Sequence, residues 1–220
     1  MKKTLVLFHG SDHIVKKPMY GLGNKHNDYG YGFYCTEDVE LGKEWACKDL
    51  NINAYVNKYE LQTEGLKILY LDKVSTVLNW ITILIQNRTF NLKNNIAKNA
   101  VKYLKANYSI DISQYDVVIG YRADDSYFTF AKDFLTNTLS LESLSSALRY
   151  GKLGEQIVLI SKKAFEKIQF VNSEKVNVSE YYYKRKNRNV EANQKYKNLS
   201  DNQDVEKETF IMDLIRGIKK

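Results

Sequence analysis

Short apolar runs alternate with polar, glycine-rich segments along the first 50 residues. Residues 5–8 (Leu-Val-Leu-Phe) predict a buried first strand that ends at His9-Gly10. A loop rich in Gly and Asn occupies residues 21–32, and residues 33–36 predict a second, short strand. The acidic residues that follow favour a helix running to about Leu50, because negative side chains stabilise a helix N-terminus.

The apolar spacing further along the chain predicts a mixture of helices and strands. Residues 73–110 are typical of a helical segment, and they contain six lysines and arginines but no acidic residue. We expect further strands at 54–61, 66–71, 116–120, 156–160 and 168–171, and helices at 126–137 and 140–150. The first two of these strands alternate as in an antiparallel sheet. The order of elements predicts an α+β domain with a split antiparallel sheet.

The pattern changes at about Asn172. A polar helix is expected around residues 181–188, a linker at 198–204, and an amphipathic helix at the end of the chain. The apolar stripe of that last helix consists of Phe210, Ile211, Leu214, Ile215 and Ile218. The stripe either packs on the main domain, which is the default, or binds a protein partner.

These patterns divide the chain into two parts. The first is a main domain at residues 1–171, with a basic helical insertion at about 72–112. The second is a helical C-terminal extension at 172–220.

Composition narrows the class of protein. Of 220 residues, 44% are hydrophobic and one is proline, which is typical of a folded globular chain. The net charge of +7 permits an anionic partner but does not require one. Cys35 and Cys47 are too few for a disulfide framework, and no stretch approaches the length of a membrane span. The apolar run before His9 is too short for a signal peptide. We expect a cytoplasmic protein with reduced thiols and no membrane contact.

Two short motifs place polar and aromatic side chains at the ends of the first two strands. Gly10 allows a ligand to approach the backbone, whose N–H and C=O groups can pair with a carboxamide. Residues 28–36 (Asp-Tyr-Gly-Tyr-Gly-Phe-Tyr-Cys-Thr) lead into the helix that carries Trp45-Ala46. Aromatic rings on the strand end and on the helix are suited to sandwich a flat ring. Each motif alone is a weak signal, and their order and spacing give them weight.

In this order, the motifs resemble those of the ADP-ribosyltransferase superfamily, in the poly-ADP-ribose-polymerase-like and diphtheria-toxin-like branch that carries a His–Tyr–Glu triad. The chain is more closely similar to an uncharacterised bacterial family placed in that superfamily. The similarity covers roughly residues 4–170. The shared patterns are His9-Gly10-Ser11, residues 28–36, Trp45-Ala46, residues 115–125 and Glu155-Gln156.

The resemblance implies an NAD-binding site and a role for each of its residues. His9 would bond the 2′-hydroxyl of the adenosine ribose, and the Gly10 backbone would pair with the nicotinamide carboxamide. Tyr34 would stack on the nicotinamide ring, with Trp45 as the second stacking aromatic. Neighbouring positions complete the expected contacts with NAD: Ser11, Gly32, Phe33 and Thr36.

The third triad position falls at the strand that opens with Glu155-Gln156, where the sequence departs from the polymerase pattern. Matching the residue just before the apolar run puts Gln156 at the position of the catalytic glutamate, and a shift by one puts Glu155 there. Successive side chains on a strand face opposite ways, so only one of the two can point into the cleft. We favour Gln156, because the closer bacterial family carries Gln at this position.

A glutamine at this position changes the expected chemistry. Cleavage of the nicotinamide–ribose bond passes through an oxocarbenium-like state, whose charge a carboxylate stabilises. Gln supplies a hydrogen bond but neither charge nor a base. We therefore expect slow mono-ADP-ribosylation that needs an already competent nucleophile and is poor at building chains. The resemblance implies NAD as substrate and a protein or nucleic-acid acceptor. For a toxin or effector, it also implies an antitoxin-like protein partner.

Several other residues have two explanations each. Asp124-Asp125 either contact substrate or order a loop near the cleft, or they cap the following helix. Arg88 either meets the pyrophosphate of NAD, which guanidinium suits, or is an exposed residue at a helix end. His9 and His13 have the spacing of a metal-binding pair on a helix, but the residues between them predict a loop. We therefore expect no metal site.

Two other functions compete with that of a transferase. A nucleic-acid-binding protein without catalysis would use Lys98, Lys102 and Lys105 on one helix face, and the aromatic and basic residues at 181–186. A catalytically inactive relative that keeps the fold as a binding module would fit the missing glutamate. The basic surfaces would equally recruit an anionic acceptor to an active transferase.

Overall fold

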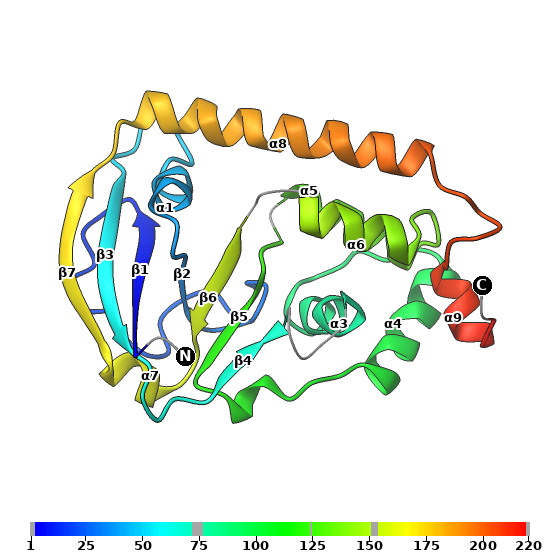
Figure 1. The fold of residues 1–220 in the computed structure, drawn as a ribbon, viewed down its shortest axis with the longest axis horizontal. Coiled ribbons are helices and arrows are strands. Elements are labelled where there is room, and N and C mark those ends of the chain that lie inside the picture. Colours follow the sequence, from blue (N-terminus) through cyan, green and yellow to red (C-terminus); the bar gives the residue numbers. More distant parts are fainter. Residues whose placement is uncertain (1–2, 72–76, 124, 151–153, 219–220) are drawn as a thin grey trace.

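Two β-sheets organise the α+β structure in the computed structural model, which describes residues 3–71, 77–123, 125–150 and 154–218 (Figure 1). The first sheet has the strand order β1-β3-β7, and both of its pairings are antiparallel. Its strands are β1 (Thr4–Ser11), β3 (Tyr55–Gln62) and β7 (Ile168–Lys175).

The second sheet has the order β2-β6-β5-β4. Its strands are β2 (Phe33–Cys35), β4 (Ile68–Tyr70), β5 (Val117–Tyr121) and β6 (Glu155–Leu159). Strand β6 is antiparallel to both β2 and β5, whereas β4 runs parallel to β5. The expectation of a purely antiparallel sheet is therefore wrong at this edge. The segment between β4 and β5 includes the helices at Val77–Asn87 and Asn95–Asn107, a connection long enough to return the chain in the same direction.

The two sheets meet where β1 passes the end of β2. The Phe8 N–H donates to the Thr36 carbonyl (2.7 Å), and the Thr36 N–H donates back to the Phe8 carbonyl (3.0 Å). His9 follows Phe8 directly, and Tyr34 lies two residues before Thr36. This bridge therefore brings together the two strand ends that carry the candidate residues.

Helix α1 (Val39–Ala46) packs on β1 and β3. It begins as the acidic residues predict, because the Asp38 carboxylate accepts hydrogen bonds from the Glu40 and Leu41 N–H groups. It ends at Ala46, earlier than the expected Leu50. The chain turns there, and the Asp49 carboxylate accepts a hydrogen bond from the Asn51 N–H in place of a helical contact.

In its described residues, the basic segment expected to be helical at 73–110 contains α3 (Val77–Asn87) and α4 (Asn95–Asn107), and residues 73–76 lie outside the described residues. The break between them ends at Asn94, whose side chain accepts a hydrogen bond from the Ala97 N–H (2.7 Å) and caps α4. A hydrophobic core packs these two helices against α5 (Asp125–Leu135), α6 (Leu141–Tyr150) and the second sheet. Its largest buried side chains include Trp80, Phe130 and Phe134.

The C-terminal part is more closely integrated with the rest than the division at residue 171 implies, because that position lies inside β7. Helix α8 (Val178–Asp201) extends into the expected linker at 198–204. It lies along α1, α5 and α6, across the top of the view in Figure 1. Two short elements complete the connections, the 3-10 helix at Ile112–Gln114 and α7 (Lys162–Glu166).

The apolar stripe of the last helix packs on the chain itself. Helix α9 (Ile211–Arg216) lies against α4, with Ile211 fully buried and Phe210 nearly so. Leu214 and Ile215 pack against the same core, and Ile218, beyond the helix, is 44% exposed. In the part of the chain that the structure describes, no helix has the length and apolar character needed to cross a membrane.

Candidate functional site

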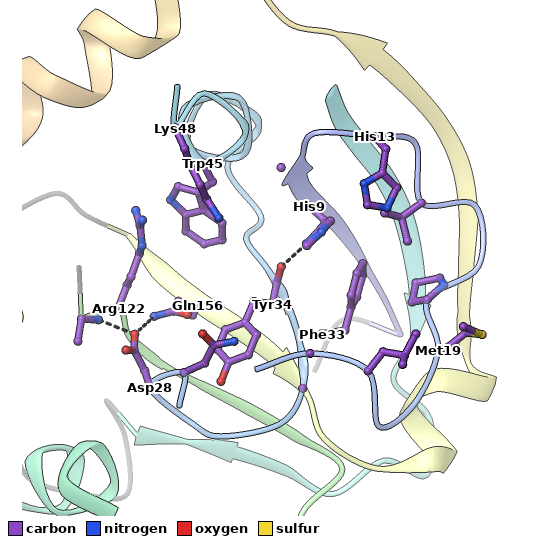
Figure 2. A pocket seen from close by; sticks show the side chains of 18 of the residues that line it. His9, His13, Met19, Asp28, Phe33, Tyr34, Trp45, Lys48, Arg122 and Gln156 are labelled. Atoms are coloured by element: carbon purple, nitrogen blue, oxygen red, sulfur yellow. Dashed lines mark hydrogen bonds between the residues drawn. The ribbon is translucent and has the colours of Figure 1, made fainter. Parts of the chain in front are cut away.

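A cavity of about 770 Å³ lies between the end of β1, the residues around β2, the C-terminal end of α1 and the start of β6 (Figure 2). Most of the residues that the sequence singled out line it. They are His9, Gly10, Gly32, Phe33, Tyr34, Trp45, Arg88 and Gln156. The first sheet, the second sheet and α1 each contribute, so the site depends on the junction between the sheets.

His9 is held at the end of β1 by a hydrogen bond from its Nδ1–H to the Tyr34 carbonyl (2.8 Å). Because a carbonyl only accepts, this bond fixes the proton on Nδ1 and leaves the Nε2 lone pair available to accept. Burial lowers the pKa of His9, and the nearby Lys48 adds to this effect, while the Tyr34 carbonyl opposes it. His9 is therefore neutral at neutral pH, with Nε2 as a hydrogen-bond acceptor.

Gly10 lets α1 approach the end of β1 closely. A Cβ atom at this position would lie 2.1 Å from the Gly42 carbonyl oxygen and 2.5 Å from the Ala46 nitrogen, both backbone atoms of α1. Gly42 is similarly restricted, because its Cβ would lie 3.0 Å from the Phe8 Cβ. The two glycines bring the backbones of β1 and α1 into contact, and this contact places Trp45 at the cavity.

Tyr34 has its hydroxyl engaged by the loop that precedes it. The hydroxyl donates to the Gly30 carbonyl (2.7 Å) and accepts from the Tyr29 N–H (3.1 Å). Gly30 has φ +73°, a conformation that favours glycine. Burial raises the pKa of Tyr34, so the phenol is neutral. With its hydroxyl satisfied, Tyr34 offers its ring to the cavity.

Trp45 comes from α1 and is 8% exposed. The Arg122 guanidinium lies 4.8 Å from the centre of its ring, a cation–π contact. Among the described residues, the buried Trp45 Nε1–H has no hydrogen-bond partner. The indole is therefore held by packing and by Arg122. Its position depends on how α1 packs against β1.

Asp28 is a site residue that sequence reasoning did not single out. The residue is 5% exposed and lines the cavity. Oδ1 accepts from Arg88 (3.0 Å), while Oδ2 accepts from the Gln156 amide (2.7 Å) and from the Ala123 N–H (2.8 Å). Burial raises the pKa of Asp28, and these three donors oppose that shift. Asp28 opens the motif at residues 28–36, and this place is the one sequence signal that pointed to it.

Gln156 and Glu155 lie differently on β6. Gln156 is 4% exposed and lines the cavity, whereas Glu155 is exposed and is not among the lining residues. The alternation of side chains along a strand accounts for this difference. Asp124 lies outside the described residues, and Asp125 is the first residue of α5.

Three of the expected NAD contacts have other partners in this structure. The Ser11 hydroxyl donates to the His13 carbonyl and accepts from the Asn57 amide, and Ser11 does not line the cavity. Thr36 is buried at the sheet junction, where its hydroxyl accepts from the Asp38 N–H (3.2 Å). Arg88 does line the cavity, but it pairs with Asp28 and lies over the Phe128 ring.

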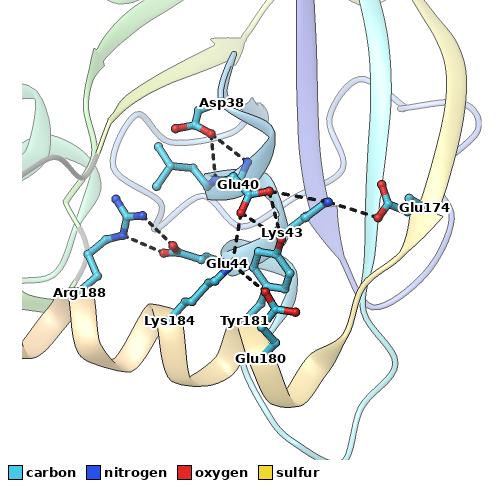
Figure 3. Close-up of polar contacts among 10 residues, drawn as sticks. Asp38, Glu40, Lys43, Glu44, Glu174, Glu180, Tyr181, Lys184 and Arg188 are labelled. Carbon is cyan, nitrogen blue, oxygen red and sulfur yellow. Dashed lines mark hydrogen bonds and ion pairs between the residues drawn. The ribbon is translucent and has the colours of Figure 1, made fainter.

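Helix α8 forms part of the cavity wall through Arg185 and Asn189. The sequence pointed to Arg185 only as one of the basic residues at 181–186, and it did not point to Asn189. Ion pairs and hydrogen bonds hold this helix against α1 (Figure 3). Arg188 binds the buried Glu44 through two hydrogen bonds of 2.8 Å and 2.6 Å. The Tyr181 hydroxyl donates to the Glu40 carboxylate (3.0 Å), which Lys184 also approaches (3.4 Å).

The charges that line the cavity are strongly unequal. One carboxylate, Asp28, faces six cationic side chains among the described lining residues. The cationic side chains are Lys16, Lys17, Lys48, Arg88, Arg122 and Arg185. This balance favours an anionic ligand. Within the described ranges, no group of three or more His, Cys, Asp or Glu side chains is placed to hold a metal ion.

Comparison with known proteins identifies a family. The model of a family described as "Protein of unknown function (DUF3990)" matches residues 5–170. The chain belongs to this family. The part of this DUF3990 protein that matches includes His9, Asp28, Tyr34 and Gln156, whereas Arg185 lies beyond it. No curated protein and no solved structure matches the chain.

Proposed function

We propose that this DUF3990 protein is a mono-ADP-ribosyltransferase that binds NAD, cleaves its nicotinamide–ribose bond and transfers ADP-ribose to a macromolecular acceptor. The observation that carries the proposal is the convergence of His9, Tyr34 and Gln156, from β1, β2 and β6, on one cavity. The proposal includes the ADP-ribosyltransferase fold, which the split arrangement of the two sheets supports.

The chemistry of the cavity suits the parts of NAD. The Tyr34 ring offers a flat face for the nicotinamide, and Trp45 supplies a second aromatic surface. His9 presents Nε2 as an acceptor for a ribose hydroxyl. The excess of cationic side chains, Lys48 and Arg122 among them, suits the pyrophosphate.

In the proposed reaction the bond between C1′ of the ribose and the nicotinamide nitrogen breaks, and its electron pair leaves with neutral nicotinamide. A nucleophile on the acceptor forms a bond to C1′ and loses its proton to solvent. The Gln156 side chain bonds the ribose but removes no proton and carries no charge. The acceptor must therefore already be nucleophilic, and transfer is slow and stops after one ADP-ribose.

The first test measures NAD binding by calorimetry and release of nicotinamide by chromatography. Replacing Tyr34 with Ala removes the stacking face, so we expect the Kd for NAD to rise by about 10- to 100-fold, which corresponds to about 1.4–2.8 kcal/mol. Tyr31→Ala is the matched control, because Tyr31 lies in the loop just before β2, is 54% exposed and does not line the cavity. Wild-type protein that neither binds nor cleaves NAD contradicts the proposal.

The acceptor is tested by supplying NAD labelled in its adenylate part to cell extract and separating protein, RNA and DNA. Label in one fraction, absent with Tyr34→Ala, identifies the acceptor class. Growth arrest on expression of the wild type, and not of Tyr34→Ala, would support a role as a toxin or effector. An antitoxin-like partner is then the protein that restores growth.

A second candidate function is an NAD-binding module without catalysis. Gln156 favours it, because the amide at this position lacks the charge that stabilises the oxocarbenium-like state. NAD binding of the wild type together with no release of nicotinamide would decide for this candidate.

A further inference from the structure

The Asp28 carboxylate accepts hydrogen bonds from three groups that lie in distant parts of the chain. Arg88 follows α3, Ala123 follows β5, and Gln156 lies in β6. All three bonds are between 2.7 Å and 3.0 Å long, and Asp28 is buried. An ionised carboxylate can only accept hydrogen bonds, so its three neighbours must face it with their N–H groups.

The Gln156 amide is therefore oriented. Its Nε2–H donates to Asp28 Oδ2 (2.7 Å), as the dashed line in Figure 2 shows. The opposite orientation would put the Gln156 Oε1 against a carboxylate oxygen, two acceptors in contact. Because the amide is planar, Oε1 diverges from Asp28, and within the described ranges no protein donor binds it. Oε1 is the negative end of the amide dipole.

We propose that Asp28 is a positioning residue that turns the Gln156 amide so that its Oε1 faces the cavity as the acceptor for the ribose of NAD. The inference rests on the proposed function. In this arrangement the oxygen of a neutral amide occupies the place of the missing carboxylate oxygen. The hydrogen bond from Nε2 to the Asp28 carboxylate polarises the amide and increases the negative charge on Oε1.

The same arrangement explains why a glutamate would not serve at residue 156. Its carboxylate would lie at hydrogen-bond distance from Asp28, and two carboxylates that close cannot both be ionised. One would be protonated at neutral pH. Asp28 and Gln156 thus form a unit in which Asp28 carries the charge and Gln156 presents a neutral amide to the ligand.

The orientation is tested first without NAD, by NMR of the side-chain amides in protein labelled with ¹⁵N. Gln156→Ala assigns the Gln156 resonance. We expect its Nε2–H signal in the wild type to be shifted downfield by the bond to a carboxylate, and to move on Asp28→Asn. Asp111→Asn is the matched control, because Asp111 makes the same kind of side-chain contacts at an exposed turn far along the chain. A Gln156 signal that does not move on Asp28→Asn overturns the positioning role.

The second measurement follows nicotinamide release by Asp28→Asn, Gln156→Glu and the double variant. Asp28→Asn leaves the Gln156 amide without its charged acceptor, and we expect kcat to fall by about 10- to 100-fold, the range typical when a partner that orients a functional ligand is lost. KM for NAD should change less than kcat. Gln156→Glu should be active only as pH falls and the carboxylate pair takes up a proton.

The double variant distinguishes positioning from a structural role. In Asp28→Asn/Gln156→Glu the amide introduced at residue 28 can donate to the carboxylate introduced at residue 156. That carboxylate then faces the cavity as the one charge of the pair, so the double variant should be faster at neutral pH than either single variant. A purely structural Asp28 predicts a double variant no faster than the slower single one, and that result overturns the inference.

The two proposals fail in distinguishable ways. Wild-type protein that neither binds nor cleaves NAD overturns the proposed function and, with it, the ribose as the ligand of Gln156. The amide resonance tests the orientation of Gln156 separately, because it needs no NAD.

Discussion

Asp28 and Glu44 are two buried carboxylates, 5% and 4% exposed, and each pairs with an arginine far along the chain. Asp28 binds Arg88, and Glu44 binds Arg188. Asp28 lines the cavity, whereas Glu44 faces α8, although it directly precedes Trp45 in α1. Neighbouring residues of a helix point in different directions, so α1 contributes Trp45 to the cavity and Glu44 to the docking of α8.

The difference between the two carboxylates lies in their other partners. Asp28 also accepts from Ala123 and Gln156, so its loss disturbs the cavity. Glu44 accepts hydrogen bonds with both carboxylate oxygens from one guanidinium, so its loss would weaken the contact between α1 and α8. A buried acid–arginine pair therefore does not identify a functional site. The groups that share the carboxylate decide whether it orients a ligand contact or joins elements of the fold.

The largest effect on stability is expected for Arg188→Ala. It leaves the Glu44 carboxylate buried without its partner, so the free energy of unfolding should fall by about 3 kcal/mol. Chemical denaturation followed by circular dichroism measures the change. A loss below about 1 kcal/mol, the value of a surface ion pair, would show that the burial of Glu44 is not decisive.

Compared with Arg188→Ala, Asp28→Asn should have a larger effect on NAD cleavage and a smaller effect on stability. The amide keeps the shape and one acceptor, so we expect the free energy of unfolding to fall by about 1–2 kcal/mol. Equal losses of stability in Asp28→Asn and Arg188→Ala would remove the distinction between the two carboxylates.

The pH dependence of stability provides a further contrast. Burial raises the pKa of Asp28 above its unfolded value, so its contribution favours the folded state at low pH and declines as pH rises through the raised pKa. Denaturation between about pH 3 and pH 7 should show this decline in the wild type and not in Asp28→Asn. If the free energy of unfolding declines equally with pH in both proteins, groups other than Asp28 cause the decline.

NAD affinity should have the opposite pH dependence, through His9. Burial lowers the pKa of His9, so Nε2 remains an acceptor below pH 6.5, and binding weakens only as pH falls through the lowered pKa. Calorimetry from about pH 5 to pH 8 tests this, with His9→Gln as a control that does not titrate. Weakening that begins above pH 6.5 contradicts the expectation.

The smallest effect is expected for Lys184→Ala. Lys184 contacts Glu180 and Glu40, but both sides of each pair are about half exposed. Solvent screens such pairs, so the free energy of unfolding should stay within experimental error of the wild type in the same denaturation experiment. A loss as large as that of Arg188→Ala would mean that exposed and buried pairs dock α8 equally.

Local patterns predicted the parts of the site that depend on short stretches of chain. The apolar run before His9, the glycines before Tyr34 and the acidic start of α1 indicated the β1 end, the β2 end and the helix that carries Trp45. The alternation along β6 restricted the choice to one of Glu155 and Gln156. Each of these features is encoded within about ten residues.

The rest depends on contacts across the chain. Asp28 binds residues 60, 95 and 128 positions away, and nothing in its own neighbourhood indicates them. The parallel pairing of β4 with β5 follows from the path through α3 and α4. Arg185 reaches the cavity wall because ion pairs dock a polar helix that has little apolar surface of its own.

The backbone contact between β1 and α1, made at Gly10 and Gly42, has a mechanical consequence. Side chains normally absorb small displacements between packed elements by changing rotamer, but the nearest neighbours of Gly10 are backbone atoms of α1, which have no rotamers to change. A movement of α1 is therefore transmitted directly to the strand end that carries His9. Glu44 connects α8 to α1, and α1 contacts β1. A displacement of α8 would therefore move α1 and, through it, the end of β1 at the cavity.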